Sequence, residues 1–132
     1  LRLYPPAAFL SRAAIAEDEL AGVRIKAGTI VTVSPFLLHR HRRLWRDPDL
    51  FDPTRFLGAN RDSIDRFAYI PFGAGPRVCI GMGFALQEAV IVLAHLTRAF
   101  RFDLAPGHVV RPVQRITLRP QGGMPMQATP RQ

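Results

Sequence analysis

The chain has 132 residues, a formal net charge of +8 and a hydrophobic content of 48%. That length suits one modest domain or a piece of a larger one, and a charged fraction of only 21% argues against a disordered tail. A single cysteine excludes an intramolecular disulfide. The most apolar stretch, residues 89–96, is too short to span a bilayer. The first residue is not Met and no signal-peptide layout follows it, so we expect a cytoplasmic fragment of a longer protein, unless a membrane anchor precedes it.

The positive charge comes almost entirely from arginine, since Lys26 is the only lysine among eighteen cations. An arginine-rich nucleic-acid-binding module is therefore one alternative. Such a module usually concentrates its charge, whereas here the net charge is +3 over residues 1–60 and +5 over residues 61–132. We favour codon usage as the explanation for most of these arginines and expect no nucleic-acid partner.

The first third of the chain predicts a small β-sheet. Pro5 and Pro6 would end whatever helix residues 1–4 belong to. Within residues 12–34, apolar and charged residues alternate before a turn at residues 26–28, and β-branched residues follow it. This pattern is typical of short hairpin strands. A short helix is expected over residues 36–43.

Residues 44–72 have an irregular pattern punctuated by proline and glycine, which predicts a long loop. We expect its recurring aromatic side chains to anchor it by burial: Trp45, Phe51, Phe56, Phe67 and Tyr69. His39 and His41, just before it, are interpreted as solvent or cap residues, because positions two apart do not share a helix face.

The spacing of apolar residues becomes typical of a helix from residue 81 to residue 100. Apolar residues that include Met82, Leu86 and Leu93 form one stripe at steps of three and four, so we expect a long helix packed deeply in the core. After it, apolar and polar residues alternate over residues 113–118, residues 120–123 are expected to form a turn, and residues 124–128 are expected to form the partner strand. This pattern predicts a second hairpin.

The segment from Phe72 to Gly81, Phe-Gly-Ala-Gly-Pro-Arg-Val-Cys-Ile-Gly, carries the chemistry. Its glycines permit tight backbone turns, and Cys79 stands just before the long helix, where the helix dipole and Arg77 both favour a thiolate. A thiolate on such a loop suits an axial haem ligand. The Phe72 ring can face the macrocycle, and the Arg77 fork can hold a propionate.

This segment resembles the haem-binding signature of the cytochrome P-450 monooxygenases, Phe72-x-x-Gly75-x-Arg77-x-Cys79-x-Gly81. Three further features occur in the family's order. Residues 1–6 resemble the end of the Glu-x-x-Arg helix and its proline pair, residues 52–56 resemble the Pro-x-Arg-Phe meander, and Ala85 matches a small residue that lets the helix lie against haem.

The resemblance implies a mainly α fold with small β-hairpins (α+β), with residues 1–132 as its C-terminal haem-binding portion. It implies that Cys79 is the proximal iron ligand, that Arg77 and Arg12 pair with haem propionates, and that Phe72, Gly81 and Ala85 belong to the cofactor site. Arg2 and Arg55 would share a buried ion-pair network whose glutamate, three residues before Arg2, lies outside the chain.

The resemblance also implies a haem-thiolate monooxygenase with haem b (iron protoporphyrin IX). Its electrons would come from NAD(P)H through a ferredoxin or flavodoxin-like partner. Phe9 and Leu10 suggest an apolar organic substrate. Arginines 40, 42, 43 and 46 form either a solvated face or a docking patch for the acidic partner. We expect the segment alone to be inactive and marginally stable; a haem-binding fragment without catalysis is the other alternative.

Overall fold

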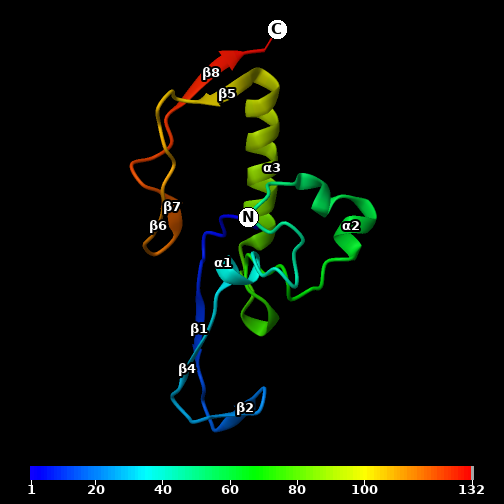
Figure 1. Cartoon of the computed structure of the whole chain (residues 1–132), viewed down its shortest axis with the longest axis vertical. Helices are drawn as coiled ribbons and strands as arrows, with labels where there is room; N and C mark the ends of the chain where they lie inside the picture. Colours follow the sequence, from blue (N-terminus) through cyan, green and yellow to red (C-terminus); the bar gives the residue numbers. More distant parts are fainter. Residues whose placement is uncertain (132) are drawn as a thin grey trace. The chain divides into compact units, whose positions relative to one another are not determined.

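The computed structural model describes residues 1–131, which divide into two compact units, Leu1–Gly73 and the segment beginning at Ala74. Each unit has its own short elements, which Figure 1 labels in chain order. Within the described residues the strands form four two-stranded antiparallel sheets, and one helix is long. No helix of this part of the chain has the length and apolarity that crossing a membrane requires.

The hairpins of the first unit confirm the β-sheet predicted around residues 12–34. Strand β1 (Leu10–Ala13) pairs with β4 (Ile30–Val33), and β2 (Asp18–Leu20) pairs with β3 (Val23–Ile25). The β2–β3 connection is the two-residue loop Ala21-Gly22, in which both φ angles are positive, 52° and 80°. Such loops are typical of type I′ turns, whose twist matches that of the strands they join.

The helix predicted over residues 36–43 is only one turn long, because α1 spans Pro35–Leu38. Its start is favourable, since the Ser34 hydroxyl caps it and proline occupies the first helical position. Continuation would need the Arg40 N–H to donate to the Phe36 carbonyl, four residues back. It donates instead to the Leu37 carbonyl at 3.0 Å, and the His41 N–H donates to the Leu38 carbonyl at 3.1 Å. The helix therefore ends in tighter, three-residue turns.

The helix end predicted for residues 1–4 is absent, because the segment contains no helical turn. A stretch of four residues cannot by itself close the hydrogen bonds that nucleate a helix. The Arg2 carbonyl lies 3.3 Å from Nδ1 of His39, so the segment is held by tertiary contacts.

An aromatic cluster anchors the irregular segment 44–72, which also contains the short turns η1 (Pro53–Phe56) and α2 (Gly58–Asp62). Trp45 is 3% exposed, and the ring centroids of Phe56 and Tyr69 each lie 6.3 Å from the Trp45 ring. Three of the five predicted aromatic anchors are thereby confirmed.

The other two predicted anchors, Phe51 and Phe67, do not bury their rings. They are 78% and 55% exposed, so the prediction was wrong for both. Phe67 has a cationic neighbour instead, because the guanidinium carbon of Arg66 lies 4.5 Å from its ring centroid. A cation over an aromatic face compensates in part for the missing burial.

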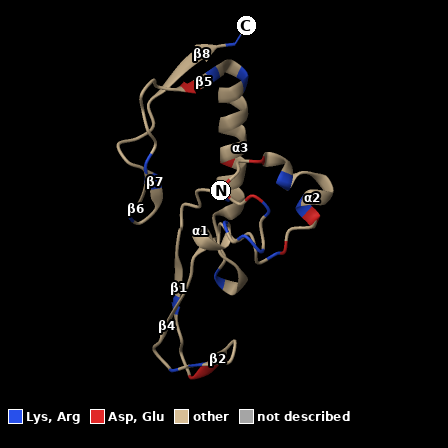
Figure 2. Ribbon diagram, viewed as in Figure 1, with Lys and Arg blue, Asp and Glu red and all other residues tan. Residues whose placement is uncertain are grey.

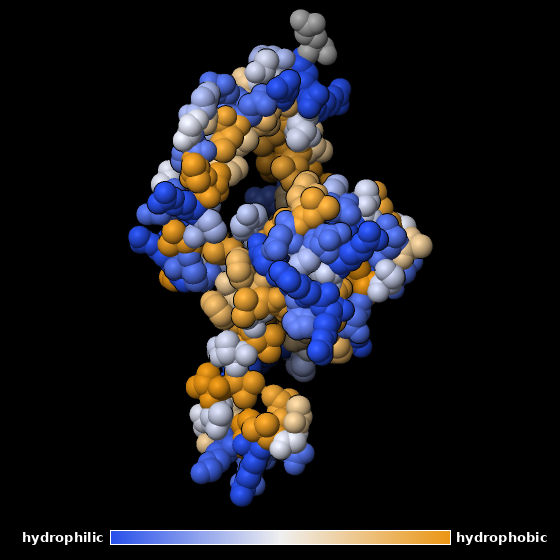
Figure 3. All heavy atoms as spheres, viewed as in Figure 1, coloured by the Kyte–Doolittle hydropathy of each residue, from blue (hydrophilic) through white to orange (hydrophobic). Residues whose placement is uncertain are grey.

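The long helix of the second unit, α3, spans Met82–Ala99 and confirms the predicted element. Its predicted deep packing is wrong within the described chain, because none of its residues is buried and Leu93 is 59% exposed. The other elements of this unit are short and leave the apolar stripe uncovered. Figure 3 shows apolar side chains at the surface of the face it draws.

The C-terminal strands pair differently from the predicted second hairpin. The stretch 113–118 is itself a tight hairpin, in which β6 (Pro112–Gln114) pairs with β7 (Leu118–Pro120) and the Arg115 N–H donates to the Thr117 carbonyl. Strand β8 (Met126–Pro130) pairs with β5 (Phe100–Leu104), which directly follows α3. The predicted turn at residues 120–123 exists, but it leads to a strand whose partner lies far back in the sequence.

Candidate functional site

The cysteine-bearing loop of the second unit is shaped by its backbone. A single 3₁₀ turn, η2 (Gly75–Arg77), is closed by the Val78 N–H, which donates to the Gly75 carbonyl at 3.1 Å. Gly75 has φ +74°, in the left-handed region that strains residues with a Cβ atom. After the loop, the Met82 N–H donates to the Cys79 carbonyl at 3.3 Å. The sulfur therefore stands on a defined turn at the start of α3.

Cys79 presents its thiol to solvent and forms no disulfide. The neighbouring Gly81 has no side chain, and a Cβ atom placed there would lie 3.9 Å from the Cys79 sulfur. An accessible sulfur on a fixed loop is the donor that thiolate-ligated haem iron requires. The loop residues therefore fit a haem ligand.

The other predicted cofactor residues lie in two separate groups. In the second unit, Arg77 is exposed at the end of η2, and half-buried Ala85 donates its N–H to the Gly81 carbonyl at 2.9 Å. In the first unit, Phe72 is half-buried. Arg12, in β1, is exposed and donates to the adjacent Ser11 carbonyl at 2.7 Å. Both arginine side chains are exposed, and the contacts of all these side chains with haem stay predictions.

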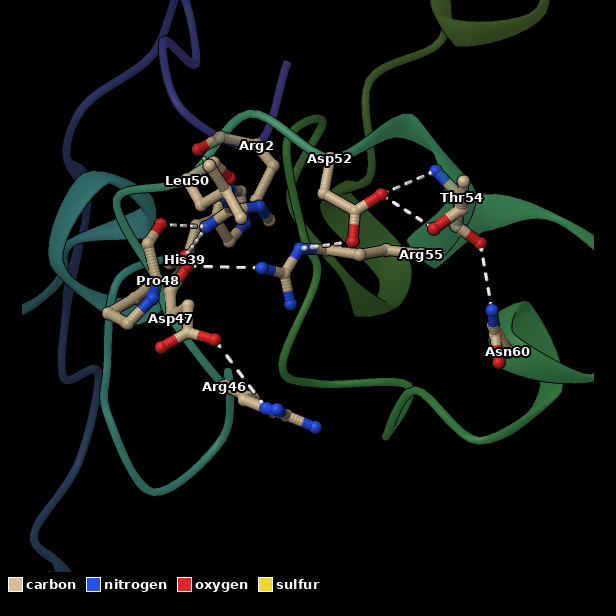
Figure 4. A network of polar contacts seen from close by, with 10 residues as sticks. All are labelled: Arg2, His39, Arg46, Asp47, Pro48, Leu50, Asp52, Thr54, Arg55 and Asn60. Carbon is tan, nitrogen blue, oxygen red and sulfur yellow. Dashed lines mark hydrogen bonds and ion pairs between the residues drawn. The ribbon is translucent and has the colours of Figure 1, made fainter.

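A second constellation, in the first unit, surrounds the buried side chain of Arg2, which is 5% exposed (Figure 4). Its Nη1 donates to the carbonyls of His39, at 2.8 Å, and Pro48, and its Nη2 donates to the Leu50 carbonyl at 2.8 Å. Its guanidinium carbon also lies 5.1 Å from the Trp45 ring centroid. One planar cation thus holds the segment after α1 and the 48–50 turn together.

Arg55 lies beside Arg2 and holds the meander turn (Figure 4). Its Nη2 donates to the Asp47 carbonyl at 3.0 Å, and its Nε lies 3.8 Å from an Asp52 carboxylate oxygen. The other Asp52 oxygen accepts from the Thr54 hydroxyl at 2.6 Å and from the Thr54 N–H at 2.9 Å. The Thr54 hydroxyl, more than any other group, lowers the pKa of Asp52.

Comparison with known proteins identifies the family of the chain that carries these two groups of residues. The family model for cytochrome P-450 matches residues 1–126. The chain belongs to the cytochrome P-450 family. It is 43% identical over 123 residues to cytochrome P-450 132 of Mycobacterium tuberculosis, covering 93% of this chain and 26% of that protein. It is 40% identical over 134 residues to thromboxane-A synthase of Sus scrofa, covering 99% of this chain and 25% of that protein.

A solved structure agrees with the sequence comparisons. The crystal structure of a cytochrome P-450DA haem domain superposes with a TM-score of 0.90 at 30% identity, covering 99% of this chain and 29% of that one. The predicted fold class, helices with small β-hairpins as part of the cytochrome P-450 fold, is thereby confirmed. The chain spans about a quarter of the length of the relatives it matches.

The P-450 ion-pair network stays a prediction, because no glutamate of residues 1–131 pairs with Arg2 or Arg55. Arg2 is held by carbonyls, and Arg55 lies near the Asp52 carboxylate. A guanidinium that binds only neutral carbonyls keeps its full charge in a buried place, which is costly without a counter-charge.

His39 is the C-cap residue of α1, which confirms one half of the interpretation as a solvent or cap residue, but it does not lie in solvent. Its side chain is fully buried rather than at the surface, and burial is the main reason that its pKa falls to about 4. The only signal in the sequence is its place directly after three apolar residues of α1. The spacing of His39 to His41 gives no such signal.

Proposed function

We propose that this chain is part of a haem-thiolate monooxygenase that oxidises a small, apolar organic substrate. The observation that carries the proposal is the exposed Cys79 sulfur on the η2–α3 loop, within a motif of a family to which the chain belongs. Haem b with a thiolate ligand supplies O–O cleavage and insertion of one oxygen atom, while the other oxygen becomes water.

The residues of this chain have supporting roles around that chemistry. Cys79 would supply the sulfur ligand. The exposed guanidinium groups of Arg12 and Arg77 would bind haem propionates through charge-assisted hydrogen bonds. Phe72 and Ala85, both half-buried, would pack against the macrocycle. Phe9 is 56% exposed and would contribute to an apolar substrate pocket.

Turnover of the haem-loaded, full-length protein tests this function. With NAD(P)H, a ferredoxin–reductase pair and ¹⁸O₂, we expect one labelled oxygen atom in the oxidised product of an apolar substrate panel. Cys79→Ser should abolish labelling because the ligand sulfur is lost. The 132-residue chain alone is expected to give no turnover. Haem uptake by the full-length protein without any oxygen-dependent product would support the non-catalytic alternative and refute the proposal.

We further propose that the electron-donating partner is an acidic, ferredoxin or flavodoxin-like protein that docks on Arg42, Arg43 and Arg46. These three side chains are exposed on the segment after α1, whose arginines are drawn blue in Figure 2. Arg40 does not belong to this surface. Its side chain is only 18% exposed, with its guanidinium carbon 4.0 Å from the Phe36 ring centroid and its Nε 3.6 Å from the Asp49 carboxylate. Arg46 also lies near a carboxylate, 3.5 Å from Asp47, but its side chain is 93% exposed.

Charge reversal tests this docking surface. Changing Arg42, Arg43 and Arg46 together to Glu should slow second-order electron transfer from an acidic ferredoxin by about ten- to a hundredfold at low salt, because electrostatic steering is lost. The matched control changes three exposed arginines of the second unit to Glu: Arg111, Arg115 and Arg119. Stopped-flow reduction measures both variants. Equal rates for the docking-surface variant and the control would contradict the proposed surface.

A further inference from the structure

The buried imidazole of His39 joins three stretches of the first unit. Its side chain has no exposed surface. The Ile70 N–H donates to Nε2 at 2.9 Å, while Nδ1 lies 3.3 Å from the Arg2 carbonyl. The ring centroid of Tyr69 lies 5.2 Å away. One histidine therefore contacts backbone that is 37 residues before it and 31 residues after it.

These two contacts select one protonation state. Because Nε2 accepts a hydrogen bond, it carries no proton, and Nδ1 carries the proton that is donated to the Arg2 carbonyl. A doubly protonated ring would set an N–H group against the Ile70 N–H. Arg2 and His39 are also joined by a second hydrogen bond, because Nη1 of Arg2 donates to the His39 carbonyl at 2.8 Å. The neutral ring satisfies all of these groups at once.

The hydrogen bonds continue beyond His39 toward the cysteine-bearing loop. The Ile70 carbonyl accepts from the Gly73 N–H at 3.0 Å, which closes a turn around Phe72. Gly73 is the last residue of the first unit, and the loop that carries Cys79 follows it in the chain. The path from Arg2 to this turn thus has three links: Arg2 to His39, His39 to Ile70, and Ile70 to Gly73.

We propose that His39 is a positioning residue that, in its neutral form, fixes the turn around Phe72 from which the haem-ligand loop starts. It touches neither substrate nor the predicted iron ligand, and it acts through Ile70. The inference rests on the proposed function, because it assumes that Phe72 and the following loop hold haem. Acid would release the turn by protonating the ring and removing its acceptor.

The cations around the ring oppose its protonation, whereas the Arg2 carbonyl, which accepts from Nδ1, favours it and raises the pKa. The cations that face it are Arg2 and the amino group of Leu1 from the N-terminal segment and Arg40 from its own turn, and the phenol of Tyr69 packs beside it. Burial is the largest cause of the lowered pKa, about 4 against an ordinary 6.5. The unfolded chain therefore binds this proton more readily, so the contribution of His39 to stability is present above pH 6.5 and is lost as the pH falls toward 4.

Three variants of the full-length protein test the inference: His39→Phe, His39→Gln and, as a matched control, His41→Gln at an exposed position of the same segment. The first readout is amide hydrogen exchange of residues 70–73, with and without haem. We expect about tenfold or faster exchange in His39→Phe, near-normal exchange in His39→Gln, whose side chain can still accept, and no change in the control. Unchanged exchange in His39→Phe would overturn the inference.

The second readout is the pH dependence of the thiolate-type absorption band of the reduced, carbon-monoxide-bound protein. In the unmodified protein the band should be lost as the pH falls through about 4, where the buried ring takes up its proton, and in His39→Gln the loss should move to lower pH because no imidazole titrates. Identical acid profiles would contradict the inference. If His39→Phe does not fold, His39→Gln and the acid profile still decide it. If the unmodified protein lacks the band, the proposed function fails, while exchange at residues 70–73 still decides the role of His39.

Discussion

Replacing Arg2 by Met is expected to lower the free energy of unfolding of the full-length protein by about 3 kcal/mol or more. Arg2 is 5% exposed and satisfies the carbonyls of His39, Pro48 and Leu50. Methionine preserves much of the side-chain volume but donates nothing, so these carbonyls lose their partner where water cannot fully replace it. Urea unfolding followed by circular dichroism measures the loss.

Two controls make the Arg2 prediction specific. Arg2→Lys keeps the charge but lacks the planar fork, so it should recover only part of the loss. Arg119→Met makes the same chemical change at an exposed position of β7 and should alter stability by less than about 0.5 kcal/mol. A value for Arg2→Met as small as that for Arg119→Met would show that the carbonyl contacts contribute nothing.

Trp45→Ala is expected to cost about 3–5 kcal/mol, because it empties the centre of the aromatic cluster. The Trp45 side chain is 3% exposed and packs against Phe56, Tyr69 and the guanidinium of Arg2. Its Nε1 is buried with no hydrogen-bond partner among the described residues. Trp45→Phe removes that unpaired N–H and keeps a ring, so it should cost about 1 kcal/mol or less.

The test is the difference between the unfolding free energies of Trp45→Ala and Trp45→Phe, measured by the same urea unfolding. Phe51→Ala is the matched control, because that ring is 78% exposed and its loss should change stability by less than about 0.5 kcal/mol. If Trp45→Phe were as damaging as Trp45→Ala, the indole N–H would have a partner that this account lacks.

The sequence predicted best those elements whose signal is local. Helix α3 follows from apolar residues at steps of three and four between Met82 and Phe100. Strands β3 and β4 follow from the alternating and β-branched residues on either side of the turn at residues 26–28, but their pairing with β2 and β1 does not. Cys79 was recognised as the candidate ligand because cysteine, arginine and glycine stand at fixed spacings in one short segment.

The sequence failed where distant residues decide the outcome. The Arg2 side chain donates to the His39 carbonyl, a contact across 37 residues that no local pattern shows. The pairing of β8 with β5 passes over the β6–β7 hairpin, and no local pattern shows that. Leu93 is exposed because the other described residues leave that face of α3 uncovered. The apolar pattern of one helix does not show which elements pack against it.

His39 illustrates the same limit within the candidate site. A histidine beside arginines resembles a solvated residue, and only the fold brings the Arg2 carbonyl and the Ile70 N–H to its two ring nitrogens. Buried polar groups of this kind are satisfied by backbone from elsewhere in the chain, so their partners leave no spacing to detect.

We propose that the Cys79 sulfur binds haem iron in the full-length protein. The most direct measurement is the absorption spectrum of the reduced, carbon-monoxide-bound holoprotein, compared with that of Cys79→Ser. We predict a strongly red-shifted Soret band in the former, because only a thiolate opposite carbon monoxide produces that shift, and its complete loss in the latter. A red-shifted band that survives in Cys79→Ser would contradict the account.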